Sequence, residues 1–336
     1  WNRLKQFADL CDRKGLVLIH HNYFQHNILE AAAHWADFPW RSANNINDTG
    51  FPEPPPYAGD KRIYMDEQFY DTRHPVRTSL HQAYIRQCLG NFADNSNVIQ
   101  MISQEYTGPV EFVQFWLDTI IDWQEKAGRS PLIGLSCTKD VQDQILSDPK
   151  RSKVISLIDI RYWWYQGDGL LYAPQGGQHL APRQHARLLH PRRTSFSQVV
   201  RAVREYRTRC SDKAVIYSAD ANYGWAVLMG GGSIPNLPST TDKDLLKAVP
   251  SMNPYNLAGN PEGQYALMDP AGDALIYADS GDTVVIDFSS IHADFTVSYI
   301  NLKTGQSEQT QKHVSGGTIV QMELENTPCL LWLRRQ

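Results

Sequence analysis

The feature that most constrains the fold is an alternation of short apolar runs with helical patterns between residues 16 and 249. The clearest run is 97–106, NVIQMISQEY, in which four of the first six residues are apolar. An apolar run of this length directly before a helical pattern predicts a buried parallel strand. Strand–helix units repeated along a chain predict a parallel sheet with helices outside it. The first part of the chain is therefore expected to be an α/β domain.

The expected strands of this part are 16–19, 98–103, 132–135, 154–160, 214–217 and 233–237. The expected helices are 1–13, 79–92, 111–126, 140–146, 196–208, 223–229 and 244–249. Residues 27–78 contain a stretch without periodicity that is rich in Asn, Pro and Gly. Long irregular segments inside a compact domain are usually functional or disordered. Because Trp35, Trp40 and Tyr57 occur in it, we expect a loop insertion that walls a site.

Beyond about residue 258 the pattern changes to alternating apolar and polar residues, as in TVVIDF and FTVSYINL, with turn signals between the runs. Short strands at this spacing are typical of an antiparallel β-sandwich. We therefore expect a (β/α) domain over 1–258 and a β-sandwich domain over 259–336.

Composition excludes several classes of protein. The net charge is −4 without a basic block, which argues against nucleic acid as a partner. No apolar run reaches about 18 residues, so no membrane span is expected. The five cysteines form no CxxC pair or disulfide framework. The 9 Trp and 16 Tyr suit core packing, and they also suit stacking against sugar rings.

Polar residues gather just after four expected strands, at 20–26, 104–106, 161–165 and 218–222. The carboxyl ends of parallel strands meet at one face, where α/β enzymes keep their chemistry.

Three acids at this face are candidates. Glu105 suits a general acid/base, or a carboxylate that caps the next helix. Asp220 suits the second carboxylate of a glycosidase pair, or an N-cap of the following helix. Asp159, two residues before Arg161, favours a buried ion pair.

The remaining candidates suit a ligand rich in hydroxyl groups. They are His20, His21, Asn22, Gln25, His26, Gln104, Tyr106, Trp163 and Asn222. The histidine spacing His-His-x4-His is not a recognised metal-ligand pattern, so neither a metal nor a cofactor is expected. Among residues 162–165, YWWY, we expect at least one ring to line the cleft, because alternate side chains point away from the core.

The motifs of three other enzyme classes are missing from the sequence. It contains no G-x-S-x-G, no P-loop and no G-x-G-x-x-G after a strand. Serine hydrolase, kinase and dinucleotide chemistry therefore lack their signatures.

The order of these features resembles the clan A glycoside hydrolases of the apiosidase-like type. An acid follows the strand at 98–103, and another follows the strand at 214–217, as in barrel strands 4 and 7 of that clan. The clan's Asn-Glu pair is Gln104-Glu105 here, and Asp220 stands where the clan has glutamate. The C-terminal part, with its turn at 301–305 and Trp332, is similar to the sandwich called a putative collagen-binding domain.

The resemblance implies a (β/α)8 TIM-barrel domain of which strands 3–8 are visible, with strands 1 and 2 before Trp1. It implies a retaining, exported (periplasmic or secreted) glycosidase in which Glu105 is the acid/base and Asp220 the nucleophile. The partner would be an oligo- or polysaccharide. Two other functions stay open: a catalytically inactive glycan-capture protein on the same scaffold, and a polysaccharide lyase.

Overall fold

The computed structural model describes residues 1–25, 28, 35–54, 64–103, 106–177 and 193–336. These residues form two compact units. The first unit comprises Trp1–Thr194 with Asp212–Ala214, and the second comprises Ser195–Ser211 with Val215–Gln336.

The first unit contains a parallel sheet whose strands follow one another in chain order. β1 (Leu18–Tyr23), β2 (Val98–Ser103), β3 (Leu132–Leu135) and β4 (Leu157–Ile160) pair in parallel, each with the next. The sheet order ends with β7 (Ala214–Tyr217), of which Ala214 belongs to the first unit. The Ala214 N–H donates to the Ser156 carbonyl at 3.0 Å. The parallel α/β sheet predicted from the sequence is confirmed.

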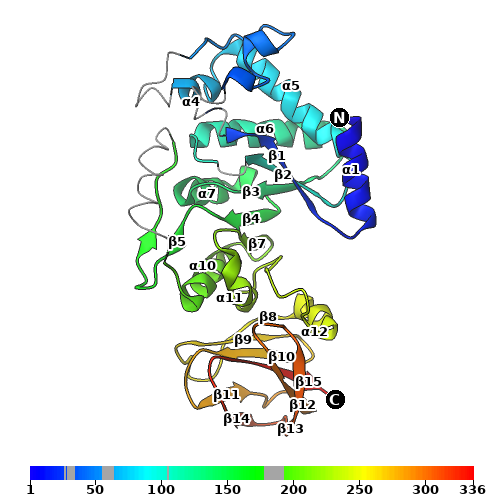
Figure 1. The fold of residues 1–336 in the computed structure, drawn as a ribbon, viewed down its shortest axis with the longest axis vertical. Helices are drawn as coiled ribbons and strands as arrows, with labels where there is room; N and C mark the ends of the chain where they lie inside the picture. Colours follow the sequence, from blue (N-terminus) through cyan, green and yellow to red (C-terminus); the bar gives the residue numbers. More distant parts are fainter. Residues whose placement is uncertain (26–27, 29–34, 55–63, 104–105, 178–192) are drawn as a thin grey trace. The chain divides into compact units, whose positions relative to one another are not determined.

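Helices separate these strands. In the first unit they are α1 (Asn2–Arg13), α4 (Tyr64–Phe69), α5 (Pro75–Asn91), α6 (Val110–Ala127), α7 (Lys139–Leu146) and α8 (Pro149–Ser152). Short 3-10 turns, η1 and η2, occupy Trp35–Asp37 and Ser42–Asn44. Helices α5 and α6 lie side by side in Figure 1.

Helix α6 shows how local sequence sets an element. Pro109 precedes it, and Gly128 ends it in the left-handed conformation (φ 62°). Its buried face carries Trp116, Leu117 and Ile120, at the spacing of one helical stripe. The helix expected over 111–126 is confirmed.

The segment 35–54 contributes aromatic rings to the interior. Trp35 is buried against Phe38 and Phe51. The Trp40 ring stacks on the imidazole of His81, with 4.5 Å between centroids. Trp35 is therefore part of the interior of the first unit and Trp40 is partly buried against His81, whereas Tyr57 lies outside the described residues.

The strand expected over 233–237 is wrong. The Ser233 N–H does donate to the Val215 carbonyl of β7 at 2.7 Å, as the first bond of a ladder would. The next residue, Ile234, has φ 50°, and Pro235 has no N–H to donate. The pairing therefore stops after one bond.

The second unit contains further helices and 3-10 turns and, among the described residues, the antiparallel strands that follow residue 252. The helices and turns are α10 (Phe196–Arg209), η4 (Ala221–Tyr223), α11 (Gly224–Met229), α12 (Lys243–Ala248) and η5 (Val249–Ser251). The strands are β8 (Asn253–Tyr255), β9 (Gln264–Met268), β10 (Ala274–Ala278), β11 (Thr283–Asp287), β12 (Asp294–Ile300), β13 (Ser307–Ser315), β14 (Ile319–Glu323) and β15 (Cys329–Arg335).

The antiparallel strands share one apolar core. Six form a sheet of order β13-β12-β15-β10-β9-β8, and β11 pairs with β14 (Figure 1). Buried side chains of both sheets, such as Ile276, Ile286 and Phe295, belong to one cluster. Strands with a period of two are thus present as expected, while the sandwich arrangement and the boundary at 258 stay predictions.

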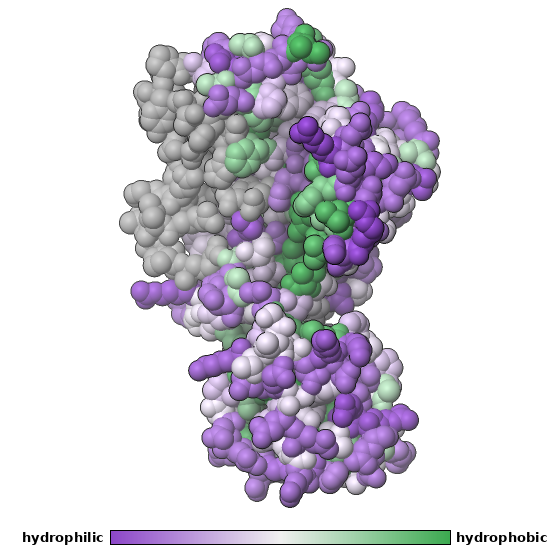
Figure 2. Space-filling model, turned by 45° about the vertical axis from the view of Figure 1, so that its right-hand side comes forward, coloured by the Kyte–Doolittle hydropathy of each residue, from purple (hydrophilic) through white to green (hydrophobic). Residues whose placement is uncertain are grey.

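Figure 2 shows one face, on which most of the coloured residues are hydrophilic and a strip of apolar residues is exposed among them. Exposed apolar side chains near the start of the chain include Phe7, Leu16 and Val17. None of the described helices is long and apolar enough to cross a membrane.

Candidate functional site

Strand β1 carries polar side chains on both faces. The sequence placed its end at Ile19, but the pairing with β2 continues to Tyr23, so His20, His21 and Asn22 lie within the strand. Because side chains alternate along a strand, His20 and His21 point to opposite faces of the sheet. The histidines predicted as one cluster are therefore divided between two environments.

The face of His20 and Asn22 meets the helices. Asn22 Nδ2 donates to Gln100 Oε1 (2.8 Å), and Trp116 Nε1 of α6 donates to Asn22 Oδ1 (2.8 Å). His20 Nδ1 lies 2.9 Å from Gln100 Oε1, and Gln100 Nε2 donates to the Cys88 carbonyl of α5. Asn22 is only 3% exposed, and burial lowers the pKa of His20. This network joins the sheet to its helices.

The opposite face carries a second polar group at the carboxyl ends of the strands. Ser136 and Asp159 lie on this face, since each follows by two residues a member of the Gly134–Leu157 pair. Ser136 Oγ donates to Asp159 Oδ2 at 2.8 Å, and Asp159 is 4% exposed.

His21 shares that face, being paired with Met101 beside Gly134. Burial first, then the positive charge of Arg161 and the neighbouring His20, lower its pKa to about 4. Its imidazole is therefore neutral near pH 7. The face thus combines a neutral histidine, a serine–carboxylate pair and a guanidinium charge.

Gln25 links the ends of β1 and β2. Its Nε2 donates to Thr107 Oγ1 (3.1 Å), and the Thr107 N–H donates to Gln25 Oε1 (2.8 Å). Tyr106 is fully buried, and its hydroxyl donates to the Pro109 carbonyl at 2.6 Å. The predicted site residues Gln104, Glu105 and His26 lie outside the described residues. The residues just after Glu105 are held in place by these bonds.

The side chains of residues 162–165, at least one of which is expected to line the cleft, are all buried. The strand β5 (Trp164–Tyr165) pairs with β6 (Leu171–Tyr172), and Tyr172 stacks on Trp164 at 4.1 Å. Trp163 Nε1 donates to Gln142 Oε1 (2.9 Å), and Lys139 Nζ lies 4.7 Å from its ring centroid. A second layer of side chains therefore covers the outward-facing rings.

Asp220 and Asn222 belong to the second unit. Asp220 caps η4: its Oδ1 accepts from the Asn222 N–H (3.0 Å) and from Asn222 Nδ2 (2.9 Å). This is the capping role given above as the alternative to catalysis, and the two bonds also hold the carboxylate in one orientation.

Gln100, Ser136 and Thr107 are residues that sequence reasoning did not select. Gln100 interrupts the apolar run of β2, and a polar side chain inside a buried strand must find partners. That interruption was the available signal. Within the described part of the chain, no three His, Cys, Asp or Glu side chains are grouped so that they could hold a metal ion.

A family model described as "Domain of unknown function (DUF6298)" matches residues 1–252. No curated protein sequence matches the chain.

Several solved structures are similar. A glycoside hydrolase of family 5 from Bacteroides vulgatus ATCC 8482 has 13% identity and a TM-score of 0.55, over 99% of this chain and 74% of that one. A structure described as a glycoside hydrolase has 12% identity and a TM-score of 0.46, over 99% and 88% of the two chains. A GH30 endoxylanase from Clostridium papyrosolvens C71 has 9% identity and a TM-score of 0.39, over 79% and 72%. The first of these shows a shared fold.

Proposed function

The chain belongs to the DUF6298 family, a family of unknown function, and we propose that it is a glycoside hydrolase that cleaves an oligo- or polysaccharide. The observation that carries the proposal is the polar face at the carboxyl ends of β1, β3 and β4, in a chain that shares its fold with a family 5 glycoside hydrolase. In parallel α/β folds these ends hold the catalytic groups.

In the proposed mechanism Glu105 protonates the glycosidic oxygen as the bond breaks. Asp220 attacks the anomeric carbon and forms a glycosyl-enzyme intermediate. Glu105, now a carboxylate, then removes a proton from the water that releases the sugar, so the anomeric configuration is retained. Carboxyl groups about 5–5.5 Å apart accompany this route, whereas about 6.5–9.5 Å accompanies inversion. Asp159, bonded to Ser136, is the other candidate for the second carboxylate.

The other site residues divide by their surroundings. We assign His21, His26 and Gln104 to hydroxyl groups of the sugar, together with Asn222, whose Oδ1 is not used in its bonds to Asp220. Five others act through position: His20, Asn22, Gln25, Tyr106 and Trp163. The hydrogen bonds of these five are made with other protein groups, so they orient the strand ends rather than contact the ring. The apiosidase-like type and export to the periplasm or the exterior complete the proposal.

The test is turnover of a panel of plant and bacterial glycans by the Glu105→Gln variant. We expect kcat to fall by about 100- to 10,000-fold, because the amide cannot donate the proton. Glu125→Gln, on an exposed turn of α6, is the matched control and should keep full activity.

Three results contradict the proposal. A wild-type protein that binds a glycan without turning it over is a glycan-capture protein. Products that absorb in the ultraviolet indicate a lyase. Unchanged turnover by Glu105→Gln removes Glu105 from the chemistry.

A further inference from the structure

The second unit contains a cavity of about 650 Å³ that the proposed chemistry does not use. Its walls come from α10, α11 and α12, from the segment 231–239 and from β8 and β9. This volume is in the range of small-molecule sites, which are mostly apolar with a few polar groups. Every lining residue belongs to the same unit.

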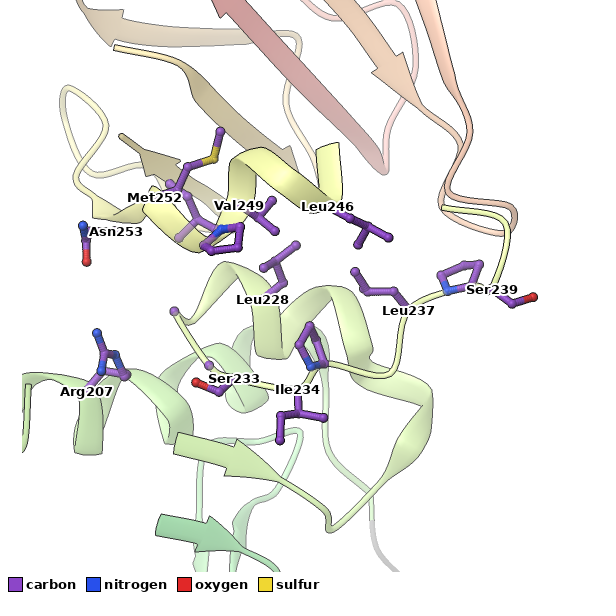
Figure 3. A pocket seen from close by; sticks show the side chains of 16 residues that line it. Arg207, Leu228, Ser233, Ile234, Leu237, Ser239, Leu246, Val249, Met252 and Asn253 are labelled. Carbon is purple, nitrogen blue, oxygen red and sulfur yellow. The ribbon is translucent and has the colours of Figure 1, made fainter. Parts of the chain in front are cut away.

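One end of the cavity is apolar. Figure 3 shows Leu228, Leu237, Leu246 and Val249 gathered around it, from α11, α12 and the segments next to them. Leu246 of α12 is 44% exposed, and Ile234 of the segment 231–239 is 63% exposed. Apolar side chains grouped at a concave surface are the usual lining of a ligand site.

Ile234 is held there against its own backbone preference. Its φ of 50° lies in the left-handed region, which a β-branched residue rarely adopts. Such a conformation persists only where the surrounding structure imposes it, and such residues cluster at ligand clamps and other functional sites. Gly232, two residues before Ile234, packs closely, since a Cβ there would lie 2.6 Å from Val227 Cγ1.

The other end of the cavity is polar and positive. In Figure 3 the side chains of Arg207 and Asn253 both lie on the left of the cavity, away from the leucines. Both carry N–H donors. Arg207 Nη1 also donates to the Ser211 carbonyl at 3.3 Å, which holds the guanidinium group at this end. The lining therefore offers a positive charge at one end and an apolar surface at the other.

We propose that this cavity binds a small amphipathic organic acid, with its anionic group at Arg207 and Asn253 and its apolar body against Leu228, Leu237, Ile234 and Leu246. Charge complementarity selects the anion, because an arginine presents N–H donors that match a carboxylate. The apolar walls favour an apolar body, because binding removes its surface from water. This site is independent of Glu105 and Asp220, so it adds a binding activity to the proposed hydrolase.

The experiment compares two fluorescent probes that share one body. The probe 8-anilinonaphthalene-1-sulfonate is an amphipathic anion, and N-phenyl-1-naphthylamine is the same ring system without the charge. We expect saturable binding of the anion at one site per chain and weaker binding of the neutral probe, by about tenfold. Octanoate should displace the anionic probe at concentrations where octan-1-ol does not.

Two variants separate the two ends of the cavity. Arg207→Gln should lower the affinity for the anionic probe about tenfold and change the affinity for the neutral probe by less than about twofold. Arg201→Gln, exposed on the same helix, is its control. Ile234→Gly should fold, because glycine adopts a positive φ without strain. It removes an apolar side chain from the lining, so it should lower the affinity for both probes. Ile46→Gly, at a fully exposed isoleucine, is the second control.

Circular dichroism and gel filtration confirm that each variant is folded. If Arg207→Gln affects both probes equally or neither, the anion site is refuted. If Ile234→Gly leaves both affinities unchanged, the probes bind elsewhere and the cavity is not their site. If Ile234→Gly instead converts a dimer into a monomer with no probe bound in either form, the surface is an interface between copies of the chain.

Discussion

Gln25 and Thr107 hold each other through two hydrogen bonds, from Gln25 Nε2 to Thr107 Oγ1 at 3.1 Å and from the Thr107 N–H to Gln25 Oε1 at 2.8 Å. Gln25 lies two residues beyond β1 and Thr107 four residues beyond β2. Both are buried, with exposed fractions of 3% and 1%. The pair therefore fixes the position of the chain just after Glu105, the proposed acid.

Replacing Gln25 with Leu should both destabilise the protein and reduce turnover. The Thr107 N–H and hydroxyl lose their partner inside the protein, which costs about 1–3 kcal/mol for each buried group left unsatisfied. We expect a lower denaturant midpoint, and a loss in kcat larger than the change in KM. Gln311→Leu, at an exposed position of β13, is the control. An unchanged midpoint for Gln25→Leu contradicts the pairing.

Asn22 and Trp116 should be energetically coupled. The Trp116 indole N–H donates to Asn22 Oδ1 at 2.8 Å inside the unit. A double-mutant cycle with Asn22→Ala and Trp116→Phe should give a coupling of about 0.5–3 kcal/mol in urea unfolding. Trp332 is the matched control, because its indole N–H has no hydrogen-bond partner among the described residues. If the coupling of Asn22→Ala with Trp116→Phe is as small as its coupling with Trp332→Phe, the hydrogen-bond network is contradicted.

The free energy of unfolding should decrease as the pH is lowered below about 6.5, partly because of His81. Burial, its first cause, lowers the pKa of His81 to about 3, and its ring nitrogens lie near Tyr23 Oη (3.1 Å) and the Phe69 carbonyl (3.2 Å). Above about pH 6.5 the imidazole is neutral whether the chain is folded or unfolded. Between about pH 6.5 and 3 only the unfolded chain takes up the proton, so each unit of acidification removes up to about 1.4 kcal/mol.

Urea unfolding of wild type and His81→Phe at pH 7, 6 and 5 measures this contribution. The free energy of unfolding of His81→Phe should change less steeply with pH, because unfolding no longer exposes a histidine that takes up a proton. Its stability at pH 7 also falls, because the Tyr23 hydroxyl loses a partner. His313→Gln, at an exposed position, should keep the wild-type slope. Parallel slopes for wild type and His81→Phe show that His81 is not the group responsible.

Gly224 should be far less tolerant of substitution than Gly90. A Cβ on Gly224 would lie 1.8 Å from the Asn236 carbonyl oxygen, which is backbone and cannot swing away. A Cβ on Gly90, in α5, meets nothing within 4 Å. We expect Gly224→Ala to destabilise by several kcal/mol, by the reasoning for overpacked sites, and Gly90→Ala to stabilise by about 0.5–1 kcal/mol. Thermal unfolding of both variants checks this, and equal melting temperatures contradict it.

Elements with a strong local signal were predictable from the sequence. The run VIQMIS produced β2, and the stripe in α6 between Pro109 and Gly128 produced that helix. Segments whose signal was weak were not. The run 233–237 looked like a strand, but a left-handed Ile234 and Pro235 end the pairing after Ser233. Pairing, which is not local, also carried β1 past Ile19 to Tyr23.

Parallel strands followed by helices, and then antiparallel strands, could be predicted from the sequence because hydrophobic period is a local property. The gathering of polar residues toward the carboxyl ends of the parallel strands could be predicted as well. The neighbours of each polar side chain could not, because they depend on how the strands and helices pack. The tertiary structure set His20 and Asn22 against Trp116 and the helices, and His21 on the face of Asp159. The physical reason is that register and pleat place each residue on one face, and burial then dictates its partners.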